Sequence, residues 1–241
     1  MNKRKIMLLV EGAKTDVDLM KHLISIYKID TKHEIVSYNT NIYDLYREMF
    51  VKNDPEDMDI LQILKEKEKN EEKKKIFNEK YTDIILIFDL DPQDHLFTEE
   101  KIMTMMNYFI ESSDMGKLYL NYPMVEAFYH MKDIPDKDFN LYNVALNELK
   151  QYKQRVNQEN RNRNYSKFAR TREECNIVIK QNIDKALWIL NRKSRNNNVI
   201  IDSIDILEKQ LDSLKNNNIV HVLCTCVFFI VDYNSKLIQE D

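Results

Sequence analysis

Glycine is nearly absent from this chain, with only two residues among 241. Motifs that need several glycines to approach phosphates, such as the Rossmann dinucleotide-binding fingerprint and the P-loop, are therefore excluded. No segment matches the P-loop pattern, so the chain is not expected to be a P-loop ATPase itself.

Cysteines and long apolar runs are scarce as well. The three cysteines, Cys175, Cys224 and Cys226, match neither a disulfide framework nor a common zinc-binding spacing. The apolar run at residues 6–10 is too short for a signal-peptide core. The longest run, at residues 220–231, is shorter than the roughly 20 residues of a membrane span. These absences favour a cytoplasmic protein without a membrane segment.

What the chain does contain is enough apolar sequence for a core, and its charge is unevenly distributed. Hydrophobic residues make up 43% of the sequence and charged residues 32%. Residues 151–195 hold 12 Lys/Arg and four Asp/Glu, a local balance of +8, although the whole chain carries −4. This asymmetry indicates either a segment with its own polyanionic partner or a helical hairpin with solvated charges, and both interpretations stay open.

The N-terminal half alternates between predicted strands and helices. Strands are predicted at residues 6–10, 34–37, 84–88 and 117–120, and helices at 14–27, 42–50, 98–111 and from residue 125. Such alternation is typical of a parallel sheet with helices on both faces. The fold class is therefore α/β, with residues 1–135 as the α/β domain and a charged insertion, solvated or mobile, at about residues 53–81.

Residues 136–241 are predicted to form a helical C-terminal region. Helical periodicity covers residues 141–155, 173–192, 201–215 and 219–233, and the last segment is β-branched enough to be a strand instead. That segment is also apolar enough for either a buried core or a subunit contact in a homo-oligomer. The sequence leaves both choices open.

Acidic residues follow two of the predicted buried strands. Glu11 ends the first, Asp89 and Asp91 end the third, and Asn121 ends the next strand along the chain. Ligands of an open parallel sheet bind beyond the carboxyl ends of its strands. Asp89 and Asp91 are expected on the same side of an extended segment. Converging carboxylates repel unless a hard cation binds them, so Glu11, Asp89 and Asp91 are predicted ligands of Mg²⁺ or Mn²⁺.

A metal ion held by carboxylates suits hydrolysis of a phosphodiester bond. In that chemistry Glu11 would serve as a ligand or as a general acid or base, and the sequence does not decide between these roles.

These residues resemble motifs of the Toprim superfamily. Residues 8–12, Leu-Leu-Val-Glu-Gly, followed by Thr15-Asp16 on a helix, resemble its first motif, and Asp89-Leu90-Asp91 resembles its DxD motif. Residues 121–128, with His130 behind them, are similar to the Asn-Pro…Glu…His region of the RloB-like branch, near the OLD-type nucleases. The resemblance covers residues 6–131; it departs from the family in having a single glycine, Gly12, and a long charged insertion.

The resemblance implies a Toprim-like fold and a metal-dependent endonuclease, an effector in antiviral defence that often works with a separate ATPase sensor protein. It also implies that Glu126 and His130 lie at the edge of the active site, where His130 would assist proton transfer or bind phosphate. The alternative for these two residues is a polar pair beside the core.

A basic, aromatic segment is the candidate nucleic-acid surface. Arginines and lysines contact phosphates, and interleaved aromatic rings stack on unpaired bases. The candidate residues are Arg155, Arg161, Arg163, Lys167, Arg170 and Arg172.

Two alternatives to the nuclease stay open. One is a non-catalytic subunit that binds nucleic acid or a partner on a Toprim-like scaffold. The other is a nucleotidyl-transferring enzyme.

Overall fold

The computed structural model describes residues 4–29, 31–56, 59–192 and 201–238. Its centre is a five-stranded sheet in the order β2-β1-β3-β5-β4. The strands are β1 (Lys5–Val10), β2 (Lys32–Ser37), β3 (Asp83–Asp89), β4 (Ile110–Glu111) and β5 (Gly116–Asn121). β2, β1, β3 and β5 are parallel, which confirms the predicted α/β class with a mostly parallel sheet. The strand β4, which was not predicted, pairs antiparallel with β5 over two residues at the sheet edge.

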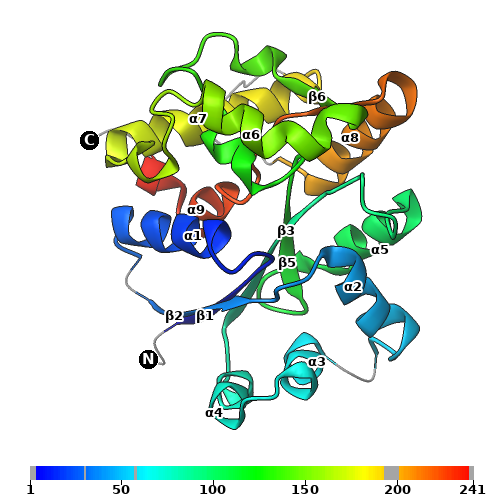
Figure 1. Cartoon of the computed structure of the whole chain (residues 1–241). Helices are drawn as coiled ribbons and strands as arrows, with labels where there is room; N and C mark the ends of the chain where they lie inside the picture. Colours follow the sequence, from blue (N-terminus) through cyan, green and yellow to red (C-terminus); the bar gives the residue numbers. More distant parts are fainter. Residues whose placement is uncertain (1–3, 30, 57–58, 193–200, 239–241) are drawn as a thin grey trace.

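Helices cover both faces of the sheet. α1 (Thr15–Ile26) lies on one side, close to α9 (Phe228–Tyr233), and α2 (Ile42–Tyr46) and α5 (Glu99–Tyr108) lie on the other side (Figure 1). A π-helical turn, Arg47–Val51, continues α2. This division follows from strand order: β1–α1–β2 steps one way along the sheet and β2–α2–β3 steps the other way, so right-handed crossovers use opposite faces.

The charged insertion forms short helices: α3 (Ile60–Lys67), α4 (Glu71–Lys74) and a 3₁₀ turn, Ile76–Asn78. α3 buries Ile60, Ile63 and Leu64 and exposes its lysines and glutamates. The insertion was predicted to be solvated, and this is true of only one face of α3. The apolar face of α3 belongs to the core.

The C-terminal region contains α6 (Leu149–Glu159), α7 (Arg172–Ile189), α8 (Ser203–Asn217) and α9, with a small ribbon of β6 (Asn143–Ala145) and β7 (Ile219–His221). The helix predicted from residue 141 was wrong at its start, because β6 pairs with β7 there. The segment 219–233 divides into β7, a buried turn and α9, so both of its predicted conformations occur.

The helix predicted from residue 125 is only a 3₁₀ helix, Val125–Tyr129. One backbone carbonyl at the end of this helix and one just beyond it accept hydrogen bonds from distant residues. The Asn160 side-chain amide donates to the Tyr129 carbonyl at 2.6 Å, and the Arg161 backbone N–H donates to the Met131 carbonyl at 2.9 Å. Such partners replace the hydrogen bonds that a longer helix would make.

One hydrophobic core cluster contains side chains from both the α/β part and the C-terminal region. Tyr122 and Leu223 join the two through a pair of backbone hydrogen bonds, each of 2.8 Å. The boundary at residue 135 stays a prediction. No helix among the described residues is long and apolar enough to span a membrane.

Candidate functional site

The predicted acidic residues meet at the carboxyl edge of the two central strands. Glu11 directly follows β1 and Asp89 ends β3; the Asp89 backbone N–H donates to Glu11 Oε2 at 3.1 Å. Asn121 ends β5 opposite Asp89 in the strand register, and its side-chain amide donates to Asp89 Oδ1 at 3.3 Å. Strand register thus brings together residues that lie up to 110 positions apart.

Asp91 reaches this edge by a different route from the one predicted. Its φ of 40° places it in the left-handed region, so the expectation of an extended Asp89–Asp91 segment was wrong. The turn is held by backbone hydrogen bonds from Leu90 to the Asn121 carbonyl and from Asp91 to the Pro123 carbonyl, at 3.0 and 3.3 Å. Asp91 nevertheless lies close enough to Glu11 for its charge to raise the pKa of Glu11.

Asp16 is a member of the site that was not predicted as such. It lies in the first turn of α1, is 5% exposed, and its Oδ1 has no hydrogen-bond partner among the described residues. A Cβ atom on Gly12 would lie 2.6 Å from Asp16 Oδ2. The one glycine in the predicted motif is therefore explained by the close approach of this carboxylate.

The carboxyl groups at this edge hold their protons unusually strongly. Burial and the charge of Asp91 raise the pKa of Glu11 from 4.5 to about 8. Burial raises the pKa of Asp16 to about 6, with the Glu126 charge adding to it. Burial and the Glu11 charge raise the pKa of Asp89 well above its usual value, and burial also raises the pKa of Asp91. The pKa values are raised because like charges lie close together in a poorly solvated site.

Glu126 joins the cluster, and a lysine accompanies it. Glu126 is 2% exposed, and its charge contributes to the raised pKa values of Asp16, Asp89 and Asp91. Lys153 on α6 places Nζ 2.6 Å from Glu126 Oε1, and this contact raises the lysine pKa. Lys153 was not predicted from the sequence, because it lies 27 residues from Glu126 and no local sequence pattern links the two.

His130 is buried and contacts groups other than the clustered acids. Its side chain is fully buried, with Nδ1 at 3.1 Å from the Tyr152 hydroxyl and Nε2 at 3.3 Å from Glu159 Oε2. Burial lowers the pKa of His130 to about 4, so the ring is neutral at neutral pH. These contacts match the alternative interpretation of a polar residue within the core.

The oxygen donors at this edge are chemically suited to Mg²⁺ or Mn²⁺. Among the described residues, however, no three His, Cys, Asp or Glu side chains are arranged around one point so as to hold a metal ion. Metal binding would therefore require rotation of these side chains toward a common point.

The six basic residues predicted to bind nucleic acid fall into two groups. Arg155 pairs with Glu159 at 3.0 Å, Arg161 pairs with Glu174 at 2.9 Å, and Arg172 donates to the Leu237 carbonyl. The other three are Arg163, Lys167 and Arg170, all exposed and without an ion pair among the described residues. Among the described residues, the side chains of this second group make neither an ion pair nor a hydrogen bond, so they are available to a ligand.

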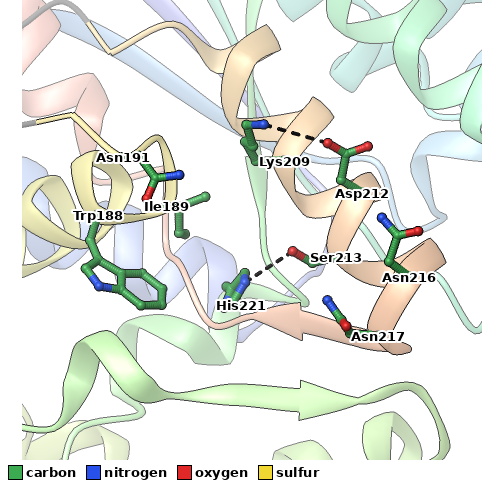
Figure 2. A pocket seen from close by; sticks show the side chains of 9 residues that line it. All are labelled: Trp188, Ile189, Asn191, Lys209, Asp212, Ser213, Asn216, Asn217 and His221. Carbon is green, nitrogen blue, oxygen red and sulfur yellow. Dashed lines mark hydrogen bonds and ion pairs between the residues drawn. The ribbon is translucent and has the colours of Figure 1, made fainter.

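A separate hollow of about 360 Å³ lies between α7, α8 and β7 (Figure 2). Ser213 Oγ lies 3.2 Å from His221 Nε2, and the half-exposed Trp188 packs edge-on against the His221 ring. His221 Nδ1 is buried without a partner among the described residues, so no carboxylate orients the ring as in a catalytic triad. We assign no chemistry to this pair.

No family model, curated protein or solved structure matches this chain. What the acidic edge does must therefore be inferred from its own residues.

Proposed function

We propose that this chain is a Mg²⁺-dependent nuclease that hydrolyses phosphodiester bonds of DNA or RNA at the acidic edge of the sheet. The observation that supports the proposal most is the crowding of Glu11, Asp89 and Asp91 beyond β1 and β3, with raised pKa values. Buried carboxylates without cationic partners are costly to a fold. Sites with strongly perturbed pKa values are frequently functional.

Glu11, Asp89 and Asp91 would hold the metal ion. When bound, the ion neutralises these carboxylates and supplies Lewis acidity to a phosphoryl oxygen. Asp16 on α1 lies close enough to Glu11 and Asp89 for its charge to raise their pKa values. It would therefore add its negative charge to the metal site.

The chain's own residues would orient the substrate. The Lys153 ammonium would hold the Glu126 carboxylate and bring positive charge next to the acidic edge. Glu126 is buried beside the acidic edge, which suits a group that accepts or donates a proton near the reacting phosphate. His130, buried and neutral, would contribute by positioning α6 through Tyr152 and Glu159.

The wider role follows from the resemblance of the motifs to the Toprim superfamily, in its RloB-like and OLD-type branch. On that basis we propose an effector nuclease in antiviral defence, acting with a separate ATPase sensor protein. We also propose that the sheet and its flanking helices form a Toprim-like fold.

Calorimetric titration with Mn²⁺ tests the metal site. Wild type is expected to bind Mn²⁺, and the folded Asp89→Ala/Asp91→Ala variant is expected to lose binding. The matched control is Glu71→Ala/Glu72→Ala, which removes two exposed acids on α4 far from the cluster and should bind Mn²⁺ like wild type. A folded wild type that binds no Mn²⁺, with or without an oligonucleotide, would favour the non-catalytic binding subunit.

Cleavage of labelled single- and double-stranded DNA and RNA tests the reaction itself. Glu11→Gln and Asp89→Asn are each expected to reduce the cleavage rate by at least about 100-fold, because each removes a metal ligand. Undiminished cleavage by both folded variants would contradict the proposal.

A further inference from the structure

A groove of about 960 Å³ runs beside the acidic edge, between α1 and the loop at residues 163–170. Its lining contains five basic side chains, Lys14, Lys21, Lys153, Arg163 and Arg170, against a single acid, Asp18. The chain as a whole is acidic, at −4, so this concentration of positive charge is local. Such a groove attracts polyanions.

One wall is a single face of α1. Asp18, Lys21 and Ser25 of α1 line the groove at spacings of three and four residues, as one helical face requires, and the N-cap residue Lys14 lies four positions before Asp18. From Lys14 to Ser25 this face extends about 16 Å at the rise of an α-helix. The lysines are available, since neither Lys14 nor Lys21 has an ion pair among the described residues. A ligand longer than one nucleotide would therefore contact both of them.

The opposite wall comes from the loop after α6. Arg163 and Arg170 are exposed, lie in this loop and line the groove without an acidic side-chain partner in the described part of the chain. In this they differ from Arg155 and Arg161, which pair with carboxylates, and from Arg172, which donates to a backbone carbonyl. Cations on both walls would contact a backbone lying between them.

Aromatic rings form part of the groove. Tyr165 stacks on Tyr129 with ring centroids 4.2 Å apart and an interplanar angle of 10°. Tyr129 is almost completely buried, at 6% exposed, whereas Tyr165 is half-buried and nearer to solvent. The inner ring thus supports the outer one, and a base could extend the stack only if it is unpaired.

The groove leads to the acidic edge through two residues. Thr15 lines the groove and directly precedes Asp16 on α1. Lys153 lines the groove as well, with Nζ 2.6 Å from Glu126 Oε1. A strand held in the groove would therefore be delivered to the carboxylates.

We propose that this groove binds single-stranded nucleic acid and guides it to the acidic edge, with phosphates on Lys14, Lys21, Arg163 and Arg170 and a base on Tyr165. This inference rests on the proposed nuclease function and names its substrate class. A base in a duplex has its faces occupied by its neighbours, so an aromatic ring in a groove favours a single strand.

Fluorescence anisotropy in EDTA tests binding without cleavage. The probes are labelled oligothymidylate and oligouridylate of about 12 nucleotides, a length within the range of known single-strand sites, and a duplex of equal length. Binding of either single strand at least about tenfold tighter than the duplex supports the inference, and the two single-strand probes tell DNA from RNA. Equal or tighter binding of the duplex, or no binding of any probe, overturns it.

Charge variants identify the groove as the site. Lys21→Gln/Arg163→Gln is expected to weaken binding and to lower the slope of log K against log salt by about 1.4, because each lost phosphate contact contributes about 0.7 for a single strand. The matched control, Lys65→Gln/Lys69→Gln, removes two exposed lysines of the distant insertion and should bind like wild type. Equal losses in both double variants would overturn the inference.

Tyr165 variants test stacking. Tyr165→Ala is expected to weaken single-strand binding about tenfold or more, whereas Tyr165→Phe keeps the ring and should retain affinity. Equal affinity of the folded alanine variant and wild type would remove the stacking site from the proposal. Because all these measurements omit metal, a failure here leaves the Mn²⁺ titration to judge the nuclease site separately.

Discussion

At the scale of single residues, the acidic edge places buried carboxyl groups close together, which destabilises the fold. Glu11, Asp16 and Asp89 are largely buried and close in space, and among the described residues no cation except Lys153 approaches the group closely. Desolvation and mutual repulsion favour the protonated forms. A divalent cation would reverse that preference, which connects stability directly to the proposed function.

The pKa of Glu11 predicts a pH-dependent stability. Between its unfolded value of 4.5 and its folded value of about 8, the folded chain holds a proton that the unfolded chain releases. Stability therefore falls as the pH rises through this interval. Without metal, Glu11→Gln should gain about 4 kcal/mol of stability relative to wild type between pH ~5 and pH ~9.

Urea unfolding in EDTA at both pH values measures this difference. Glu71→Gln, an exposed acid on α4, is the control and should show no such pH dependence. A Glu11→Gln variant that is destabilised equally at both pH values would show that the carboxylate is a structural acceptor for the Asp89 N–H rather than a strained charge.

At the scale of elements, buried polar contacts fix how α7 packs against the segment before β6. Lys185 on α7 is fully buried and donates from Nζ to the carbonyls of Phe139 and Tyr142, at 2.6 and 2.7 Å. The Lys185 Nζ also lies 4.5 Å from the centre of the Phe139 ring. These contacts hold the turn before β6 against α7.

Replacing this lysine tests the anchor. Lys185→Met keeps the apolar stem but leaves two buried carbonyls without their donor, so we expect a loss of about 2 kcal/mol in the free energy of unfolding. Lys209→Met, at an exposed position on α8, should change stability by less than about 0.5 kcal/mol. Urea denaturation of both variants measures the difference; equal stability of Lys185→Met and wild type would contradict the anchoring role.

At the scale of the whole molecule, the C-terminal region completes the α/β core. Val222, Leu223, Cys224, Cys226 and Val227 are all fully buried. The same stretch touches the candidate site, because the Cys226 N–H donates to Asn121 Oδ1 at 3.2 Å. The apolar run predicted as either core or subunit contact thus packs inside its own chain.

A fragment of residues 1–135 is therefore expected to fold poorly by itself. It would expose the core surface that residues 222–230 cover and would lose the Tyr122–Leu223 backbone pair. Circular dichroism and thermal unfolding should show no cooperative transition for the fragment, in contrast to the full chain. A cooperative transition would instead support residues 1–135 as an independent domain.

The sequence by itself determined the order and type of the central elements. Residues 6–10 and 84–88 are short, continuous apolar runs ended by acids, and that pattern is local enough to read as buried strands with polar carboxyl ends. Because parallel strands align those ends, Glu11, Asp89 and Asn121 were expected together, and they are together.

Only the tertiary structure decided which distant side chains join or neutralise one another. Asp16 and Lys153 enter the site because α1 and α6 pack beside the sheet edge. Arg155 and Arg161 are neutralised by glutamates that a local count of charges cannot assign to them. Hydrophobic periodicity is a short-range property, whereas partners, burial and pKa values depend on contacts between segments far apart in the chain.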